Sequence, residues 1–377
     1  MQHKLIGTKS IEALIDEIDE HIEKGYMPTL AFVYTSVQYD VSQLHSEIGK
    51  YPFLVVGSTT VGEIYADNNH GVNTKDESIV CMLLDIDASA LALTVKDIDD
   101  TNYYKLGCEI SEWSKKKFDN PALITISSNH YFDNDDYVRG LQTGVSCFFG
   151  GAAGDDRKFI NTYVFSGDKL TTSGVLALAL DREKIEIVSS RGFGWSGIGT
   201  QRVVTHSEKN IVYTIDDKPA INFYKDYLNI TQDDMPNTGA DYPLEVELSN
   251  GQVVYRAAIY INEENGALVF AGHVEENAKV RISAPIGETV IEHVRESVEA
   301  SLKDKEQFQA DFTLVFPCAA HKSLLGKYKI KEIETVYQAT KKAPLIGFYA
   351  YGEIATSSDV NAFHNETFVT VQLREKL

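Results

Sequence analysis

The stretch Gly57-Ser58-Thr59-Thr60-Val61-Gly62-Glu63-Ile64 follows a short apolar run, and the rest of the chain is organised around it. A stretch with the same spacing of glycines and glutamate, Gly347-Phe348-Tyr349-Ala350-Tyr351-Gly352-Glu353-Ile354, lies near the other end of the sequence. A looser copy, Phe148-Phe149-Gly150-Gly151-Ala152-Ala153-Gly154-Asp155-Asp156, lies between them. Each copy predicts a buried strand that runs into glycines, which permit unusual backbone dihedrals, and then reaches a carboxylate. We interpret the three copies as the walls of one ligand site.

Helices and strands are expected to alternate in the same order before the first and the last copy. Apolar residues at positions 11, 14, 15, 18 and 22, for example, have the spacing of an amphipathic helix. The expected helices cover residues 11–22, 41–48, 285–302 and 324–342, and the expected strands cover 29–34, 52–56, 312–316 and 345–348. This pattern predicts a mixed α/β fold in which two related domains, residues 1–205 and 206–377, each hold a mixed β-sheet flanked by helices. The sheets are expected to pack into a layered sandwich.

Composition restricts the classes of partner. The 377 residues include 35 basic and 55 acidic ones, so the net charge is −20, which disfavours binding to nucleic acid or to an anionic membrane surface. The sequence has no apolar run of about 18 residues and no signal-peptide core, so we expect no membrane insertion and a cytoplasmic location. Four cysteines without a CxxC pair, and histidines without metal-ligand spacing, predict free thiols and no metal site.

The glycine stretches are poor phosphate loops, because Glu63 and Glu353 stand where a P-loop carries its lysine. They are either tight strand exits, in which the glutamate caps a neighbouring turn, or parts of a polar site. In a polar site, backbone N–H groups would bind a ligand's acid group and the carboxylates would bind its amine, as a zwitterion such as an amino acid requires. The candidate ligand-binding residues in these stretches are Ser58, Thr59, Glu63, Gly151, Asp155, Tyr349, Tyr351 and Glu353.

The segment Arg191-Gly192-Phe193-Gly194-Trp195-Ser196-Gly197 contains a G-x-G-x-x-G pattern after an expected strand. A dinucleotide site also needs a helix directly after the glycines, and the residues that follow are poor helix formers. We therefore interpret the segment as a loop that presents Arg191 and Trp195 to a pocket, with a core position for Trp195 as the alternative.

Cys318 and His321 follow an expected strand, and His364 and Asn365 precede the last one. A cysteine–histidine nucleophile would need a third residue to orient the histidine, and a buried thiol beside a surface histidine is the simpler interpretation. His364 and Asn365 either lie near Glu353 at the mouth of the site or belong to a turn. We predict no catalytic residue, and we include Cys318, His321, His364 and Asn365 among the ligand-binding candidates.

The sequence resembles FIST proteins, which have an N-terminal and a C-terminal FIST domain. The resemblance rests on the three glycine stretches and on Lys218-Pro219-Ala220, Phe316-Pro317-Cys318 and Phe363-His364-Asn365-Glu366-Thr367. It implies a sensory module that binds a small ligand, amino acids among them, and that signals through a separate output protein such as a kinase, because the sequence holds no output domain. It implies no reaction. At His321 the chain departs from the arginine that we expect in most of the family.

Two alternatives remain open on the sequence. Some members of the family resemble haem-dependent nitric-oxide sensors that act on a histidine kinase, and His321, His364 and Cys318 are the candidate haem ligands here. The other alternative is a hydrolase built on Cys318 and His321. The leading hypothesis is a cytoplasmic sensor of an amino acid or a related small metabolite.

Overall fold

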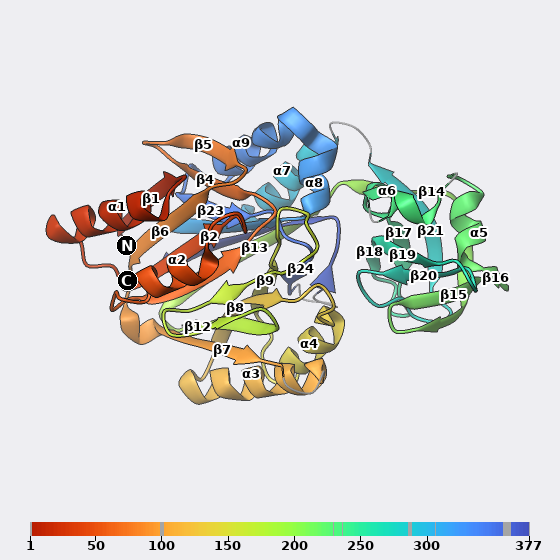
Figure 1. The fold of residues 1–377 in the computed structure, drawn as a ribbon, viewed down its shortest axis with the longest axis horizontal. Helices are drawn as coiled ribbons and strands as arrows, with labels where there is room; N and C mark the ends of the chain where they lie inside the picture. Colours follow the sequence, from red (N-terminus) through yellow and green to blue (C-terminus); the bar gives the residue numbers. More distant parts are fainter. Residues whose placement is uncertain are drawn as a thin grey trace.

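Three six-stranded mixed sheets form the larger part of the described structure, and a fourth sheet forms a smaller lobe beside them (Figure 1). The structure is a computed structural model that describes residues 2–98, 102–228, 230–235, 237–285, 289–305, 307–356 and 363–376. We call residues 195–285 the lobe and the other described residues the body. The predicted α/β fold, with mixed sheets and flanking helices in layers, is confirmed.

The three sheets of the body share one plan. Sheet 1 has the order β1 (Gln2–Thr8), β6 (Ile79–Asp85), β2 (Leu30–Thr35), β3 (Leu54–Thr59), β10 (Val164–Phe165) and β11 (Leu170–Thr171). Sheet 2 has the order β13 (Ile185–Phe193), β26 (Thr367–Glu375), β22 (Phe312–Pro317), β23 (Leu345–Phe348), β4 (Glu63–Asp67) and β5 (Gly71–Lys75). Sheet 3 has the order β25 (Phe363–His364), β24 (Glu353–Ala355), β9 (Phe148–Ala152), β8 (Pro121–Ser128), β12 (Gly174–Asp181) and β7 (Leu91–Asp97).

Each sheet is built on a parallel pair of strands, β2–β3, β22–β23 or β8–β9. On one side two antiparallel strands extend the pair, and on the other side a two-stranded hairpin extends it. In each sheet, this hairpin is formed by residues that follow the parallel pair of another sheet in the sequence. After β3 the chain crosses to β4 beside β23, after β23 it crosses to β24 beside β9, and after β9 it reaches β10 beside β3. The three glycine stretches are these crossings, so the body is a cyclic arrangement of three similar units.

Helices cover the outer faces of the sheets. The body helices are α1 (Ile11–Glu23), α2 (Val41–Ile48), α3 (Tyr103–Lys117), α4 (Asn134–Leu141), α7 (Thr289–Leu302), α8 (Ala319–Leu325) and α9 (Lys329–Ala339). The single helix expected over residues 324–342 is divided, because Gly326 adopts a positive φ of 50° after α8. Likewise Pro285 ends a strand, and α7 starts at Thr289 rather than at the proline.

The central core lies between the three sheets. Phe32 from sheet 1, Phe316 from sheet 2 and Ile124 from sheet 3 belong to one cluster of buried side chains. Separate clusters lie beneath α1 with α2, beneath α3 with α4, and beneath α7 with α9. Each sheet is covered on both faces, so its parallel strands are apolar along their whole length. This is why these strands appear in the sequence as short apolar runs.

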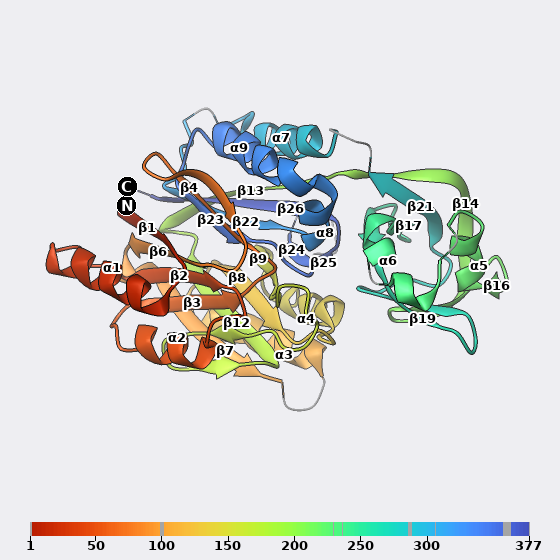
Figure 2. The ribbon, with the colours of Figure 1, turned by 45° about the horizontal axis from the view of Figure 1, so that its top comes forward.

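The lobe has a core of its own. Its main sheet has the order β18 (Val253–Arg256), β17 (Leu244–Glu247), β21 (Lys279–Pro285), β14 (Trp195–Glu208), β15 (Ile211–Ile215), β20 (Ala267–Phe270) and β19 (Ala258–Asn262), with β16 (Lys218–Pro219) beside β15. The helices α5 (Ala220–Lys225) and α6 (Asn237–Asp241) complete it. β13 of the body continues into β14 of the lobe (Figure 2). The domain boundary predicted between residues 205 and 206 falls within β14, and as a division of the sequence it stays a prediction.

Candidate functional site

The three glycine stretches meet in the body and hydrogen-bond to one another. The N–H of Val61 donates to the carbonyl of Tyr349 at 3.0 Å, and the N–H of Tyr349 donates back to Gly62 at 3.0 Å. The third stretch joins them through Gly154 N–H to the Thr59 carbonyl at 3.0 Å and Ala152 N–H to the Gly352 carbonyl at 2.8 Å. The expected convergence in space is therefore present, but these N–H groups are used within the protein. These contacts give no support to the predicted role of the N–H groups in binding a ligand's acid group, and that role stays a prediction.

The carboxyl group of Glu63 is hydrogen-bonded to other residues of the protein. It is fully buried, and its Oε1 accepts a hydrogen bond from the Thr60 hydroxyl at 2.5 Å. Its Oε2 accepts from both the N–H and the hydroxyl of Ser78, at 3.1 and 2.7 Å. Burial raises the pKa of Glu63 to about 7, although these donors oppose the shift. Both oxygens have protein partners, as expected of a carboxyl group that fixes a strand crossing.

Asp155 is satisfied in the same way. It accepts from the hydroxyl of Tyr351 at 2.6 Å and from the N–H groups of Phe159 and Ile160 at 3.1 and 2.7 Å. Burial alone would raise its pKa, but hydrogen bonds from His130, Tyr351 and the backbone hold that pKa at about 2. The ring of Tyr351 stacks on Phe159 with 5.1 Å between centroids. Asp155 and Tyr351 therefore order the loop that follows β9.

Four further candidates lie inside the sheets or their crossings. Ser58 and Thr59 are fully buried in β3, and their hydroxyls bond to the backbone carbonyls of Thr59 and Tyr163. Gly151 pairs with Glu353 across β9 and β24 and so lies at the base of the next group of residues. Tyr349 is fully buried, and its hydroxyl has no hydrogen-bond partner among the described residues.

Glu353 differs from Glu63. Its Oε2 accepts from the N–H of Thr367 at 3.2 Å, whereas its Oε1 is buried without a hydrogen-bond partner in the described structure. Glu366, which the sequence interpretation missed, is also buried, and its Oε2 likewise has no partner in this part of the chain. Burial first, and then the charge of Glu366, raise the pKa of Glu353 well above its usual range. Burial first, and then the charge of Asp241, raise the pKa of Glu366.

The thiol of Cys318 lies next to both carboxyl groups. Burial, followed by the charges of Glu353 and Glu366, raises the pKa of Cys318 well above its usual value, so the thiol stays protonated. The imidazole of His321 points elsewhere: its Nδ1 lies 2.7 Å from Glu332 Oε1. This arrangement disfavours the cysteine–histidine nucleophile, which would need a thiolate activated by the imidazole.

His364 and Asn365 flank the same position. Arg191 Nη1 donates to His364 Nε2 at 2.9 Å, so Nε2 is the acceptor and Nδ1 carries the proton of a neutral ring. Burial and then the charges of Arg191 and Arg256 lower the pKa of His364 well below its usual value. Asn365 is buried, and its Oδ1 has no hydrogen-bond partner among the residues described.

The lobe covers this group of residues. Trp195 and Tyr255 of the lobe form one apolar cluster with Cys318 and Ala320 of the body. The indole of Trp195 lies 5.1 Å from the His321 ring, and its N–H donates to the Asp241 carbonyl at 3.1 Å. We define the junction site as Arg191, Trp195, Cys318, His321, Glu353, His364, Asn365 and Glu366. All but Glu366 are among the residues predicted from the sequence.

A second set of contacts holds the lobe to the body. Arg256 is fully buried in the lobe, and its Nη2 lies 3.1 Å from Asp135 Oδ1 on α4. Its other nitrogens donate to the carbonyls of Phe363 and His273, at 3.2 and 2.9 Å. Lys209 of the lobe reaches two further carboxylates of this region. The contacts to Asp135 and Phe363 tie the lobe to α4 and to β25, the strand that carries His364.

Asp133, Asp136 and His273 are close enough together to hold a cation, with ligand atoms within 4.8 Å of one another. The ammonium group of Lys209 already lies 3.0 Å from Asp133 and 2.7 Å from Asp136. Contacts with Asp133 also raise the pKa of His273 against the effect of burial. We therefore interpret this group as an ion-pair network between lobe and body.

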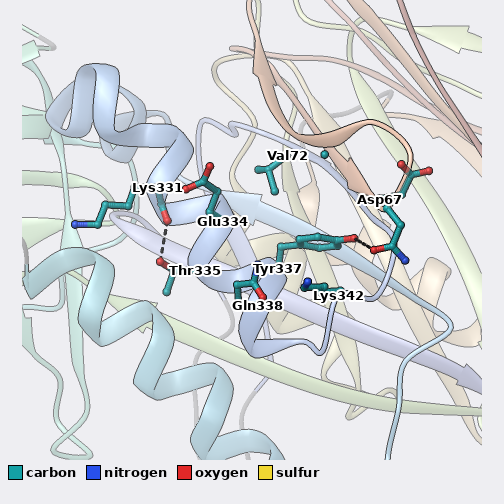
Figure 3. A pocket seen from close by; sticks show the side chains of 10 residues that line it. Asp67, Val72, Lys331, Glu334, Thr335, Tyr337, Gln338 and Lys342 are labelled. Atoms are coloured by element: carbon teal, nitrogen blue, oxygen red, sulfur yellow. Dashed lines mark hydrogen bonds between the residues drawn. The ribbon is translucent and has the colours of Figure 1, made fainter.

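A surface pocket of about 540 Å³ lies away from the junction site, between the β4–β5 turn and α9 (Figure 3). Its volume is in the range of small-molecule pockets. Asp67, Lys331 and Lys342 line it, and the hydroxyl of Tyr337 is used in a hydrogen bond to Asn68 at 3.2 Å. None of the residues predicted to bind a ligand lies in its wall.

Comparison with known families identifies the chain. The FIST N domain matches residues 29–218, and the FIST C domain matches residues 220–356. The chain belongs to the FIST family. FIST domains are sensory domains that bind small ligands in signal transduction, and they are not a catalytic family. No curated protein matches the chain. No helix in the described part of this FIST protein is long and apolar enough to cross a membrane.

Some functional residues of this FIST protein left only a weak signal in the sequence. Glu366 follows Asn365 directly and precedes the last strand, a position typical of an exposed turn residue, so the sequence alone does not indicate a buried carboxylate there. Glu332 lies on α9, where it reads as one more charge of a surface helix. Arg256 stands within a short strand of the lobe, and its position beside Asp135 depends on how the lobe docks.

Proposed function

We propose that this FIST protein is a cytoplasmic sensor that binds an amino acid or a related small metabolite at the junction site. Its output passes to a separate signalling protein, of which a kinase is the first candidate. The site lies where the lobe meets the body, which is a common location for small-molecule sites. A ligand held there would contact both units, so its arrival would change how they pack.

The single observation that carries this proposal is the group of buried polar atoms without partners. Glu353 Oε1, Glu366 Oε2 and Asn365 Oδ1 are all buried and have no hydrogen-bond partner among the described residues. Leaving one such atom unsatisfied costs about 1–3 kcal/mol, more if it is charged, so several together in one place need an explanation. A ligand with hydrogen-bond donors satisfies them, and this is the explanation that the sensory family supports.

The cationic side chain of Arg157 gives a zwitterion a second anchor. Its Nη2 donates to the Ala319 carbonyl at 2.7 Å, and its charge partly opposes the rise in pKa that burial causes at Asp241 and Glu366. It therefore lies within electrostatic reach of the junction site. An amino acid would direct its ammonium group to the glutamates and its carboxylate towards this guanidinium.

A thermal-shift screen of the purified chain against amino acids and related metabolites tests the proposal. A ligand that binds only the native state adds about 2.7 kcal/mol of stability at roughly 100 times its Kd, and the effect saturates as the site fills. We expect one compound class to raise Tm in this way, and Trp195→Ala to weaken its binding. A screen in which no compound stabilises the protein would refute the proposal.

A haem-dependent nitric-oxide or redox sensor that acts on a histidine kinase is a second proposal, favoured by His321. Its Nδ1 is held by Glu332, and its Nε2 is buried without a hydrogen-bond partner in the described structure, an arrangement typical of an axial ligand. Cys318 and His364 fit less well, since the thiol stays protonated and Arg191 occupies the His364 Nε2. A macrocycle at His321 would also have to displace Trp195. A Soret band after reconstitution that His321→Ala abolishes would support this alternative, and the absence of any band would end it.

A further inference from the structure

Two buried carboxyl groups of the junction site, those of Glu353 and Glu366, repel each other electrostatically, and no cation of the described residues is paired with either of them. Glu353 and Glu366 are both buried and both lie beside the Cys318 thiol, and each raises the pKa of that thiol. Neither carboxyl group forms an ion pair among the described residues, although the charge of Arg157 reaches Glu366. Two like charges at such a distance in a dry site cannot both persist, so either a proton or a cation must balance them.

Glu63 in the first glycine stretch can be compared directly with Glu353 in the last one. In the first glycine stretch Glu63 occupies the corresponding position, and Thr60 supplies a hydroxyl to its Oε1. In the last stretch Ala350 stands where Thr60 would be, so the hydroxyl is missing and Glu353 Oε1 has no such partner. The contacts on the other oxygen correspond, since Ser78 N–H bonds to Glu63 and Thr367 N–H bonds to Glu353. Among the described residues, Oε1 is therefore the oxygen of Glu353 that is left without a hydrogen-bond partner.

We infer that the junction site recognises a protonated primary amine, and that Glu353 and Glu366 bind its ammonium group. This inference rests on the proposed function and narrows its ligand class. An ammonium group has three N–H donors, and the junction site holds three buried acceptor atoms without a partner in the described structure, namely Glu353 Oε1, Glu366 Oε2 and Asn365 Oδ1. Its charge replaces the proton that otherwise relieves the repulsion between the two glutamates. The ring of Trp195, which lines the same site, offers a further favourable surface to a cation.

An ammonium group fits these residues better than a metal ion. A metal site brings its ligand atoms within a few ångströms of one another, and among the described residues the group that does so is Asp133, Asp136 and His273. Glu353, Glu366 and Cys318 are not grouped in this way among the described residues. The two carboxyl oxygens and the amide oxygen of Asn365 are hydrogen-bond acceptors, and the N–H donors of an ammonium group satisfy such atoms directly.

The test compares three compounds that share one side chain, namely the amino acid that stabilises the protein best, the amine that lacks its carboxylate and the hydroxy acid that carries a hydroxyl in place of its ammonium group. Affinity for the full chain is measured by calorimetry. We expect the amine to keep measurable affinity and the hydroxy acid to lose about tenfold or more, the cost of one lost charge-assisted hydrogen bond. Glu353→Gln and Glu366→Gln should each weaken amine binding by a similar factor. Glu63→Gln is the matched control and should leave affinity unchanged.

The outcomes separate the two proposals. If the hydroxy acid binds as tightly as the amino acid itself, the amine inference is overturned while the sensor proposal stands. If Glu353→Gln and Glu366→Gln both bind the amine with wild-type affinity, the amine inference is likewise overturned while the sensor proposal stands. If no compound of any skeleton binds, the sensor proposal fails together with the inference. Far-UV circular dichroism of each glutamine variant confirms that a loss of affinity is not a loss of fold.

Discussion

The buried pair of Arg256 and Asp135 gives the sharpest test of how the lobe is held to the body. The guanidinium is fully buried, and Asp135 Oδ1 accepts from it at 3.1 Å. The second oxygen of Asp135 accepts from the N–H of His273 at 2.8 Å. In Asp135→Asn the amide NH₂ must face one of these two donors. The variant therefore loses a hydrogen bond and also leaves the guanidinium without its counter-charge.

Removing one partner of a buried ion pair costs about 3–5 kcal/mol, because the other charge stays buried. Arg256 keeps its bonds to the carbonyls of Phe363, Tyr255 and His273, which places the expected loss near the lower end, about 3 kcal/mol. At about 2–4 °C per kcal/mol for units of this size, the transition that separates lobe from body should shift down by roughly 6–12 °C. Scanning calorimetry measures this shift, and limited proteolysis should show that the lobe becomes the first site of cleavage.

Glu186→Gln is the control for this prediction. It breaks the ion pair between Glu186 and Arg374, in which both side chains are about one-third exposed, and such a pair is worth about 0–1 kcal/mol. If Asp135→Asn shifts the transition no more than Glu186→Gln does, then the buried pair does not hold the lobe to the body, and the reasoning from burial is wrong.

Three further predictions concern the glycine stretches. Burial raises the pKa of Glu63 from 4.5 to about 7, so between these pH values the folded protein holds a proton that the unfolded chain has released. The free energy of unfolding should therefore fall by about 3 kcal/mol as pH rises from 4.5 to 7. Urea titrations at several pH values measure this slope, and Glu63→Gln should flatten it. An unchanged slope would contradict the assignment. Gly150→Ala should lower the urea midpoint of unfolding strongly, because φ at this residue is 144° and the new Cβ would lie 1.8 Å from the Thr125 carbonyl oxygen. A midpoint within error of wild type would show that the backbone at this crossing does not require glycine. Tyr351→Phe removes the hydrogen bond to Asp155 and should cost about 1–3 kcal/mol, and faster cleavage of the loop after β9 by a protease should accompany the loss.

The local features of the fold could be predicted from the sequence, because they depend on neighbouring residues. The helix over residues 11–22 and the strands before the glycine stretches follow from periodicity and apolar runs, and the structure places them as α1, β3 and β23. The exchange of hairpins between sheets could not be predicted in this way. β4 pairs with β23 across some 280 residues of sequence, and nothing in either strand specifies that partner.

The same distinction applies to the site. Glu353, His364 and Asn365 lie close together in sequence around β24 and β25, and their proximity was predictable from a hairpin. Whether a carboxylate has partners depends on residues far away, such as Ser78 for Glu63. The motif therefore predicted two equivalent glutamates, and the structure distinguishes one with full hydrogen bonding from one without.

This distinction suggests how a repeated architecture acquires a ligand site. Three similar crossings each bury a carboxyl group, and in two of them, at Glu63 and Asp155, protein donors satisfy it and the group serves stability. In the third crossing Ala350 stands at the position that Thr60 occupies in the first, and Glu353 Oε1 has no hydrogen-bond partner among the described residues. The surrounding sheets, which the other two crossings help to hold together, can bear the cost of that unsatisfied atom, about 1–3 kcal/mol. Ala350→Thr would offer a hydroxyl to Glu353 Oε1, so we expect it to raise the Tm of the free protein and to weaken binding of an amine at this oxygen; an unchanged Tm together with unchanged affinity would contradict this reasoning.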